Sequence, residues 1–163
     1  MEKSLPVHLD TFKQAMGRLA TGVSVITSKD QDYNFGLTAS SVTSLTAEPP
    51  MLLVCIHQKT GTREAIVNSG HFAVHILHEH QSELALQFAN SSTDKFAGLD
   101  IIYGKHGIPL LQDYFVRIEC QAVHEAKAGT HSIFMGEIHQ VEIQEKRPLL
   151  HFKSEFGKFV SAK

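Results

Sequence analysis

The feature that most constrains this fold is a pair of long β-rich segments joined by a four-residue connection. Residues 115–126 and 131–143 contain many β-branched and apolar side chains, a composition that favours extended strands. The connection Lys127-Ala128-Gly129-Thr130 contains a glycine, as tight turns often do. Strands linked this closely pair antiparallel, because a parallel crossover needs about a dozen residues or more. We therefore expect an antiparallel sheet built around this hairpin.

Shorter segments of similar composition predict further strands, and apolar residues at helical spacing predict helices. The expected strands are Thr21–Thr27, Phe35–Ser44, Met51–His57, His71–Leu77 and Leu149–Phe152. The expected helices are Phe12 to about Leu19 with Asp10 as its cap, Thr60–Asn68 ended by Ser69-Gly70, and Glu79–Phe88. The prolines at positions 49 and 50 should interrupt strand pairing, since proline lacks a backbone donor. Residues 90–107 are polar and carry the weakest pattern.

Six or seven strands with two or three helices do not fit the regular alternation of a doubly wound parallel sheet. We expect a mainly β fold, a closed or nearly closed antiparallel barrel of six to seven strands with peripheral helices. The sequence contains no internal repeat, low-complexity segment or linker, so residues 1–163 are expected to form a single domain.

Composition excludes several function classes. A net charge of −2 with neutral histidines offers no basic surface for nucleic acid or membranes. The longest apolar runs, such as 51–56, fall far short of the ~20 residues that span a bilayer, and the start MEKSLPVHLD lacks a secretory apolar stretch. Cys55 and Cys120 lie inside apolar runs and are expected to be small buried side chains. A cytoplasmic location is expected.

A hydroxyl-rich segment runs from Thr38 to Thr46. Five hydroxyl side chains between positions 38 and 44 are more than a half-buried strand needs. Small polar side chains let a ligand approach the backbone, whose amide and carbonyl groups can bind a polar heterocycle. The alternative is an edge strand with a solvated face.

Two further segments could bind a ligand. Residues 57–63 join a buried strand to a helix, and unpaired amides at a helix start favour phosphate, with Lys59 adding positive charge. The alternative is a capped helix with a solvated basic face, since neither GxxxxGK[ST] nor GxGxxG occurs. Gly129-Thr130-His131-Ser132 places a histidine at a turn, where it could contact a dinucleotide or remain a surface hydrogen-bonding group.

Metal and nucleophilic chemistry have little support in the sequence. His71, His75, His78 and His80 are close in sequence, but neither zinc-finger spacing nor HExxH occurs, and no metal site is expected. A GxSxG nucleophile motif is also absent.

Five segments, in order along the chain, resemble the flavin reductase family of the FMN-binding split barrel. They are Phe12–Thr27, Gly36–Ile56, Phe72–Leu77, Gly129–Ile138 and Pro148–Phe152. The resemblance covers nearly the whole chain and is weakest over residues 90–107. The chain is most similar in kind to the reductase partners of aromatic-ring hydroxylases and of styrene monooxygenase.

The resemblance implies hydride transfer from NADH or NADPH to FMN or FAD, with reduced flavin passing to a separate oxygenase and with no obligatory catalytic side chain. It also implies a homodimer. The family's flavin contacts fall on Thr38, Ala39, Ser40, Ser41, Val42, Ser44, Leu45, Lys59, Thr60, Thr62, Lys95 and Phe96. Its nicotinamide contacts fall on His131, Ser132 and Phe156.

The chain departs from the family pattern on the nicotinamide side. Thr130 stands where the family commonly has aspartate, and Glu155-Phe156 where it has a basic residue and tyrosine. The choice between FMN and FAD and the choice between NADH and NADPH therefore stay open. Two rival functions also stay open, a non-catalytic flavin-binding protein and an oxidase of pyridoxal-type phosphates.

Overall fold

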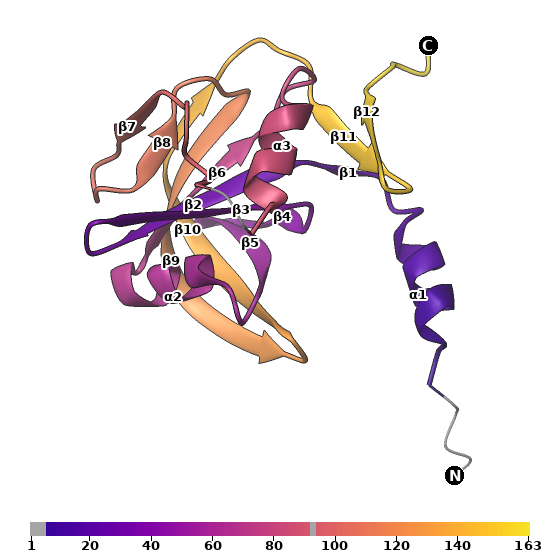
Figure 1. The fold of residues 1–163 in the computed structure, drawn as a ribbon, viewed down its shortest axis with the longest axis horizontal. Helices are drawn as coiled ribbons and strands as arrows, with labels where there is room; N and C mark the ends of the chain where they lie inside the picture. The colour runs from indigo at the N-terminus through magenta and orange to yellow at the C-terminus, as the bar shows by residue number, and fades with distance from the viewer. Residues whose placement is uncertain (1–5, 92–93) are drawn as a thin grey trace.

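A seven-stranded antiparallel sheet forms the body of the computed structural model, which describes residues 6–91 and 94–163 (Figure 1). The order of strands across it is β3-β2-β6-β9-β10-β5-β4. These strands are β2 (Ser24–Asp30), β3 (Tyr33–Ala39), β4 (Val42–Ala47), β5 (Pro50–His57), β6 (His71–Ile76), β9 (Val116–Ala128) and β10 (His131–Ile143).

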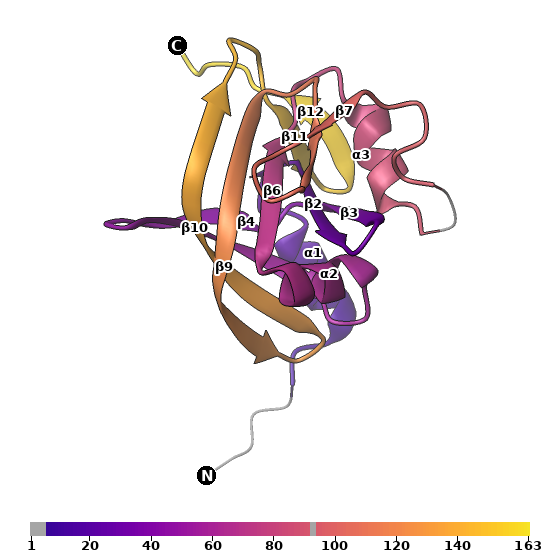
Figure 2. The same ribbon diagram turned by 90° about the vertical axis from the view of Figure 1, so that its left-hand side faces the viewer.

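The predicted hairpin is confirmed as the longest element of this sheet. Its strands β9 and β10 have 13 residues each and pair from His131 opposite Ala128 to Ile143 opposite Val116. Gly129, at the turn, has a φ of 56°, a left-handed conformation that glycine adopts without strain. Figure 2 shows the two strands side by side, with the helix α2 (Gly61–Ser69) close to their turn.

The prediction of one strand over Phe35–Ser44 is wrong. The segment breaks at Ser40 and Ser41, and its two halves pair on opposite edges of the sheet, β3 with β2 and β4 with β5. The hydroxyl-rich pattern continues through the break, so it carries no signal of a change of partner. Because β3 and β4 do not pair with each other, the described sheet is a nearly closed, split barrel of seven strands.

Two small sheets flank the barrel. The predicted strand Thr21–Thr27 is interrupted at Val23, and its first part, β1 (Thr21–Gly22), joins β11 (Leu149–Phe152) and β12 (Glu155–Lys158) in a three-stranded sheet. β7 (Ile101–Tyr103) and β8 (Pro109–Leu111) form a separate hairpin. The sequence pattern missed β7, β8 and β12, because three or four residues are too few to show a period.

The described residues form three helices, of which α2 and α3 (Ser82–Ala89) pack on the barrel. In α1 (Leu9–Met16) the cap is His8, whose Nδ1 accepts from the Asp10 N–H, and not Asp10 itself. The helix ends before Gly17, a poor helix former, and not near Leu19 as predicted. α2 begins one residue later than the predicted Thr60, which is its N-cap, and includes Ser69 before ending at Gly70. α3 begins later than predicted.

The apolar core lies inside the barrel. Along β5, Leu52, Val54 and Ile56 are buried at every second position, as expected for a strand with one inward face. They pack with Phe72 and Phe134 from the neighbouring strands. In the part of the chain that the structure describes, no helix is long and apolar enough to cross a membrane.

A close approach in this core generates a stability prediction. A Cβ at Gly136 of β10 would lie 2.5 Å from the buried Phe72 ring, whereas one at Gly22 of β1 would meet nothing within 4 Å. We expect Gly136→Ala to lower the free energy of unfolding by about 1–3 kcal/mol, because overpacking forces the core to shift. Urea denaturation measures this change, and Gly22→Ala is the matched control. Equal midpoints for the two variants would contradict the prediction.

Candidate functional site

The hydroxyl-rich segment is an exposed edge of the barrel. β4 pairs only with β5, so the backbone groups on its other side are unpaired with any described strand. Ser40, Ser41, Ser44 and Leu45 are exposed, whereas Val42 is half-buried. A bulge between Ser44 and Thr46 further disturbs the pairing there. The edge thus offers a flat ligand both hydroxyl and backbone hydrogen-bonding groups.

The start of α2 is a capped helix N-terminus. The Thr60 hydroxyl donates to the His57 carbonyl, at 2.9 Å, and accepts from the Arg63 N–H, at 3.3 Å. His57 Nδ1 accepts from the Lys59 N–H at 3.1 Å, which orients this turn further. The amides of a helix's first turn and its dipole favour a bound anion.

A hollow of about 490 Å³ opens at this helix start. It is lined by residues 34–36 of β3, by 59–62, by Ser91 and by 94–96, and we call it the α2 hollow. It brings together five predicted flavin contacts: Lys59, Thr60, Thr62, Lys95 and Phe96. Lys95 Nζ donates to the Gly36 carbonyl at 2.9 Å, and burial lowers the pKa of Lys95 below its ordinary value.

A second hollow, of about 220 Å³, lies further along β3. Thr38 and Ser40 line it with Phe156 of β12, His151 and the helix α3, and we call it the β12 hollow. The Thr38 hydroxyl donates to the Ala85 carbonyl of α3 at 2.5 Å. The structure therefore brings Phe156, predicted on the nicotinamide side, beside two predicted flavin contacts. Ala39 between them is buried.

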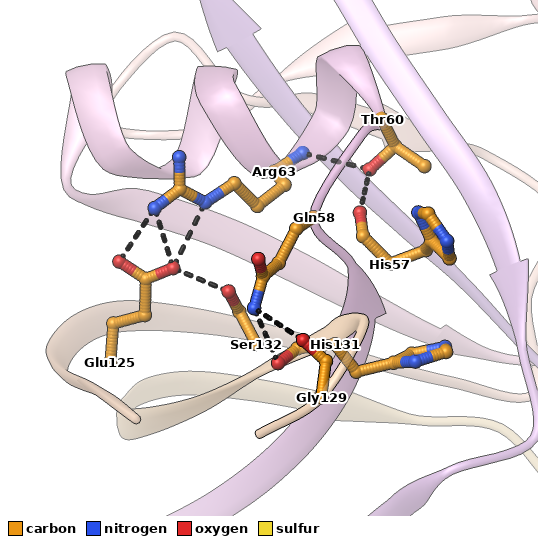
Figure 3. Close-up of polar contacts among 8 residues, drawn as sticks. All are labelled: His57, Gln58, Thr60, Arg63, Glu125, Gly129, His131 and Ser132. Atoms are coloured by element: carbon orange, nitrogen blue, oxygen red, sulfur yellow. Dashed lines mark hydrogen bonds and ion pairs between the residues drawn. The ribbon is translucent and has the colours of Figure 1, made fainter. Parts of the chain in front are cut away.

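His131 lies at the start of β10, next to the end of β5 (Figure 3). Gln58 Nε2 donates to the His131 carbonyl at 2.9 Å, and the Gln58 N–H donates to the Thr130 carbonyl at 2.9 Å. The rings of His131 and His57 meet edge to face with centroids 5.2 Å apart. Gln58 therefore holds the hairpin turn beside the start of α2.

A second set of bonds joins the same hairpin to α2. Arg63 and Glu125 form a bidentate ion pair at 2.7–2.9 Å, and the Ser132 hydroxyl donates to the same carboxylate at 2.5 Å (Figure 3). Partial burial raises the pKa of Glu125, but the bonds from Ser132 and Arg63 outweigh it and hold the pKa below its usual value. Ser132 is fully buried, so its contact with a nicotinamide stays a prediction.

The clustered histidines have separate structural partners. His75 is fully buried, accepts from the Leu111 N–H and binds the Val25 carbonyl, and burial lowers its pKa to about 4. His78 binds Asp113, whereas the His71 ring stacks on His106. Among residues 6–91 and 94–163, no three potential ligands are placed to hold a metal ion. Burial also raises the pKa of Cys120 to about 12, which makes it an inert thiol.

Comparison with known proteins decides the family. The flavin reductase-like domain matches residues 16–159. This chain belongs to the flavin reductase-like domain family. The reductase component of a 4-nitrophenol 4-monooxygenase/4-nitrocatechol 2-monooxygenase from Rhodococcus opacus is 37% identical over 155 residues, which cover 95% of this chain and 83% of that protein.

Solved structures show the same family. Flavin reductase PheA2 in its native state is 34% identical, with a TM-score of 0.88 over 95% of this chain and 100% of that chain. The NADH:FAD oxidoreductase SgcE6 of Streptomyces globisporus, solved in complex with NAD and FAD fragments, is 27% identical. Its TM-score is 0.89 over 98% of this chain and 99% of that chain.

The residues of this flavin reductase-like domain fit a flavin. The unpaired edge of β4 offers hydrogen-bonding groups for the polar rim of an isoalloxazine ring. The start of α2, with Lys59 and Thr60, has the donors that a phosphate group requires. FMN and FAD contain both an isoalloxazine ring and a phosphate group.

The sequence did not predict several residues of the candidate site. Gln58, Arg63 and Glu125 carry the bonds that join the hairpin to α2, although only Gln58 and Arg63 lay in a segment singled out by its composition. Glu125 is 62 positions from Arg63 along the chain. Only the pairing of β9 with β10 could have signalled its place near Ser132.

The Glu125 network generates a pH prediction. The lowered pKa of Glu125 means that the native state favours the charged carboxylate. The resulting stabilisation is fully present above the pKa of glutamate in the unfolded chain, about 4.3, and it is lost as the pH falls through the native pKa. We expect Glu125→Gln to lower the Tm by a few degrees at pH 7, with the difference from the parent shrinking toward pH 3. Thermal melts followed by circular dichroism measure it. A difference that stays constant with pH would contradict the assignment.

Proposed function

We propose that this protein is an NAD(P)H-dependent flavin reductase that transfers a hydride to FMN or FAD and supplies reduced flavin to a separate monooxygenase. The observation that carries this proposal is that hydrogen bonds from Gln58 hold the His131 turn beside the start of α2. The helix start that we propose as the phosphate site thus lies beside an exposed imidazole. The monooxygenase reductase component from Rhodococcus opacus, 37% identical, supports the role of a partner enzyme.

The flavin side uses the edge strand and the α2 hollow. Thr38–Val42, Ser44 and Leu45 contact the ring system through hydroxyl and backbone groups. Lys59, Thr60 and Thr62 hold the phosphate, and Lys95 with Phe96 approaches from the segment after α3. The lowered pKa of Lys95 reflects burial, which an anionic ligand at the hollow would offset.

The nicotinamide side uses His131 and Phe156. His131 is exposed, and its Nδ1 shares a hydrogen bond of 2.9 Å with the Thr130 hydroxyl, which orients the ring. Phe156 offers an aromatic face in the β12 hollow beside Thr38. Buried Ser132 supports the turn through Glu125.

When bound, the flavin accepts the hydride directly from the nicotinamide cofactor, so the chemistry belongs to the two cofactors. The protein orients them and limits the access of water. No side chain is therefore required as a nucleophile or as an obligatory acid. His131 positions the nicotinamide and stabilises nearby charge.

We propose that residues 1–163 work as one domain of a homodimer in the cytoplasm. The helix α1 supports an assembly, because none of its residues is buried and Leu9, Phe12 and Met16 expose an apolar face. In Figure 1 this helix extends away from the barrel. Cys55 and Cys120 are free thiols, as a reducing compartment favours.

The function has a direct test. Purified protein with NADH or NADPH in air should oxidise the nicotinamide cofactor only when FMN or FAD is added, at turnover numbers typical of enzymes, about 1–1,000 per second. Loss of absorbance at 340 nm reports it. Tight flavin retention with both nicotinamides untouched would instead identify a non-catalytic flavin-binding protein.

His131 has a narrower test. We expect His131→Ala to raise the KM for the nicotinamide cofactor about tenfold, because one oriented contact is lost, with a smaller change in kcat. His124→Ala, an exposed histidine of the same hairpin, is the control. An unchanged KM and kcat in His131→Ala would remove this residue from the site.

A further inference from the structure

We propose that the α2 hollow binds the adenylate half of FAD, so that this protein selects FAD over FMN; the inference rests on the proposed function. FMN ends at its single phosphate, whereas FAD continues through a second phosphate to ribose and adenine. The hollow has the size, charge and hydrogen-bonding groups for that additional part.

The size of the α2 hollow exceeds what one phosphate group needs. Its volume of about 490 Å³ lies in the range of ~300–1,000 Å³ that is typical of sites for whole small molecules. Its lining also continues from the start of α2 onto residues 34–36 of β3 and onto Ser91 and residues 94–96. These surfaces lie beyond the helix amides that would hold the phosphate of FMN.

The charge of the lining suits a pyrophosphate. Lys59 and Lys95 provide two positive charges and Asp94 one negative charge, which leaves a formal net charge of +1 in addition to the helix dipole. Lys59 follows β5 and Lys95 follows α3, so the two ammonium groups come from different segments around the hollow. A bridging diphosphate can use both.

Two aromatic rings in the lining suit a planar base. A Cβ at Gly61 would lie 2.8 Å from the Phe35 ring, so that ring packs directly on the backbone of the α2 turn. Phe96 is held edge to face against the buried Phe88, with centroids 5.1 Å apart. Both rings are only half-buried. Rings fixed in this way are good stacking surfaces for a purine.

Asn34 supplies the most specific feature. Its Nδ2 donates to the Tyr103 hydroxyl at 3.0 Å, but its Oδ1 is buried with no hydrogen-bond partner in the described part of the chain. A buried acceptor without a donor is unfavourable, so a ligand that supplies one gains affinity. The exocyclic amine of adenine is such a donor, and FMN has no equivalent at this end.

Binding to the unmodified full chain tests the inference first. We expect titration to give a Kd for FAD about tenfold lower than for FMN, and ADP to compete with FAD where inorganic pyrophosphate does not. Equal Kd values, or displacement by pyrophosphate as effective as by ADP, would overturn the adenylate assignment. Oxidation of NADH with either flavin would still support the proposed function, so the two failures are distinguishable.

A variant then tests Asn34 itself. We expect Asn34→Ala to raise the Kd for FAD roughly five- to tenfold and to leave the Kd for FMN unchanged, because only the adenine contact is lost. Asp32→Ala, in the exposed turn of the same β2–β3 hairpin, should leave both Kd values unchanged. Equal changes in the two flavins with Asn34→Ala would overturn the role of Asn34.

Discussion

Hydrogen bonds from Gln58 to the hairpin turn fix the relation between the two halves of the site. The side-chain and backbone N–H groups of Gln58 bind the carbonyls of His131 and Thr130, and the Arg63–Glu125 ion pair holds the same hairpin against α2. A bidentate pair adds geometric specificity to its energy. The turn before α2 and the exposed imidazole of His131 are therefore held together by these bonds.

The break between β3 and β4 at Ser40 and Ser41 determines which strand lies at the edge of the sheet. Because the chain leaves β2 and joins β5 at this point, β4 becomes the last strand of the described sheet, with its outer backbone groups unpaired. Exposed strand edges favour unwanted pairing, and natural proteins usually protect them. Under the proposed function, a bound flavin would cover those groups.

The sequence predicted the elements with a long or regular pattern. The β9–β10 hairpin, β5 and α2 follow from side-chain periodicity and from the residues that end each element. The break at Ser40 was missed because small hydroxyl residues suit a strand and a crossing equally. The partners Glu125 and Asn34 were missed because their contacts lie 62 and 69 positions away, beyond any local pattern. The flavin contacts themselves came from family resemblance.

The way in which the hairpin turn is held has a consequence for position 130. Gln58 binds the backbone carbonyls of Thr130 and His131 and no side chain of the turn. These bonds are therefore independent of which side chain stands at position 130. A substitution there would remove the bond between the Thr130 hydroxyl and His131 Nδ1 and leave the Gln58 bonds to the backbone in place. Position 130 can therefore change the orientation of the exposed imidazole while the hairpin stays joined to α2.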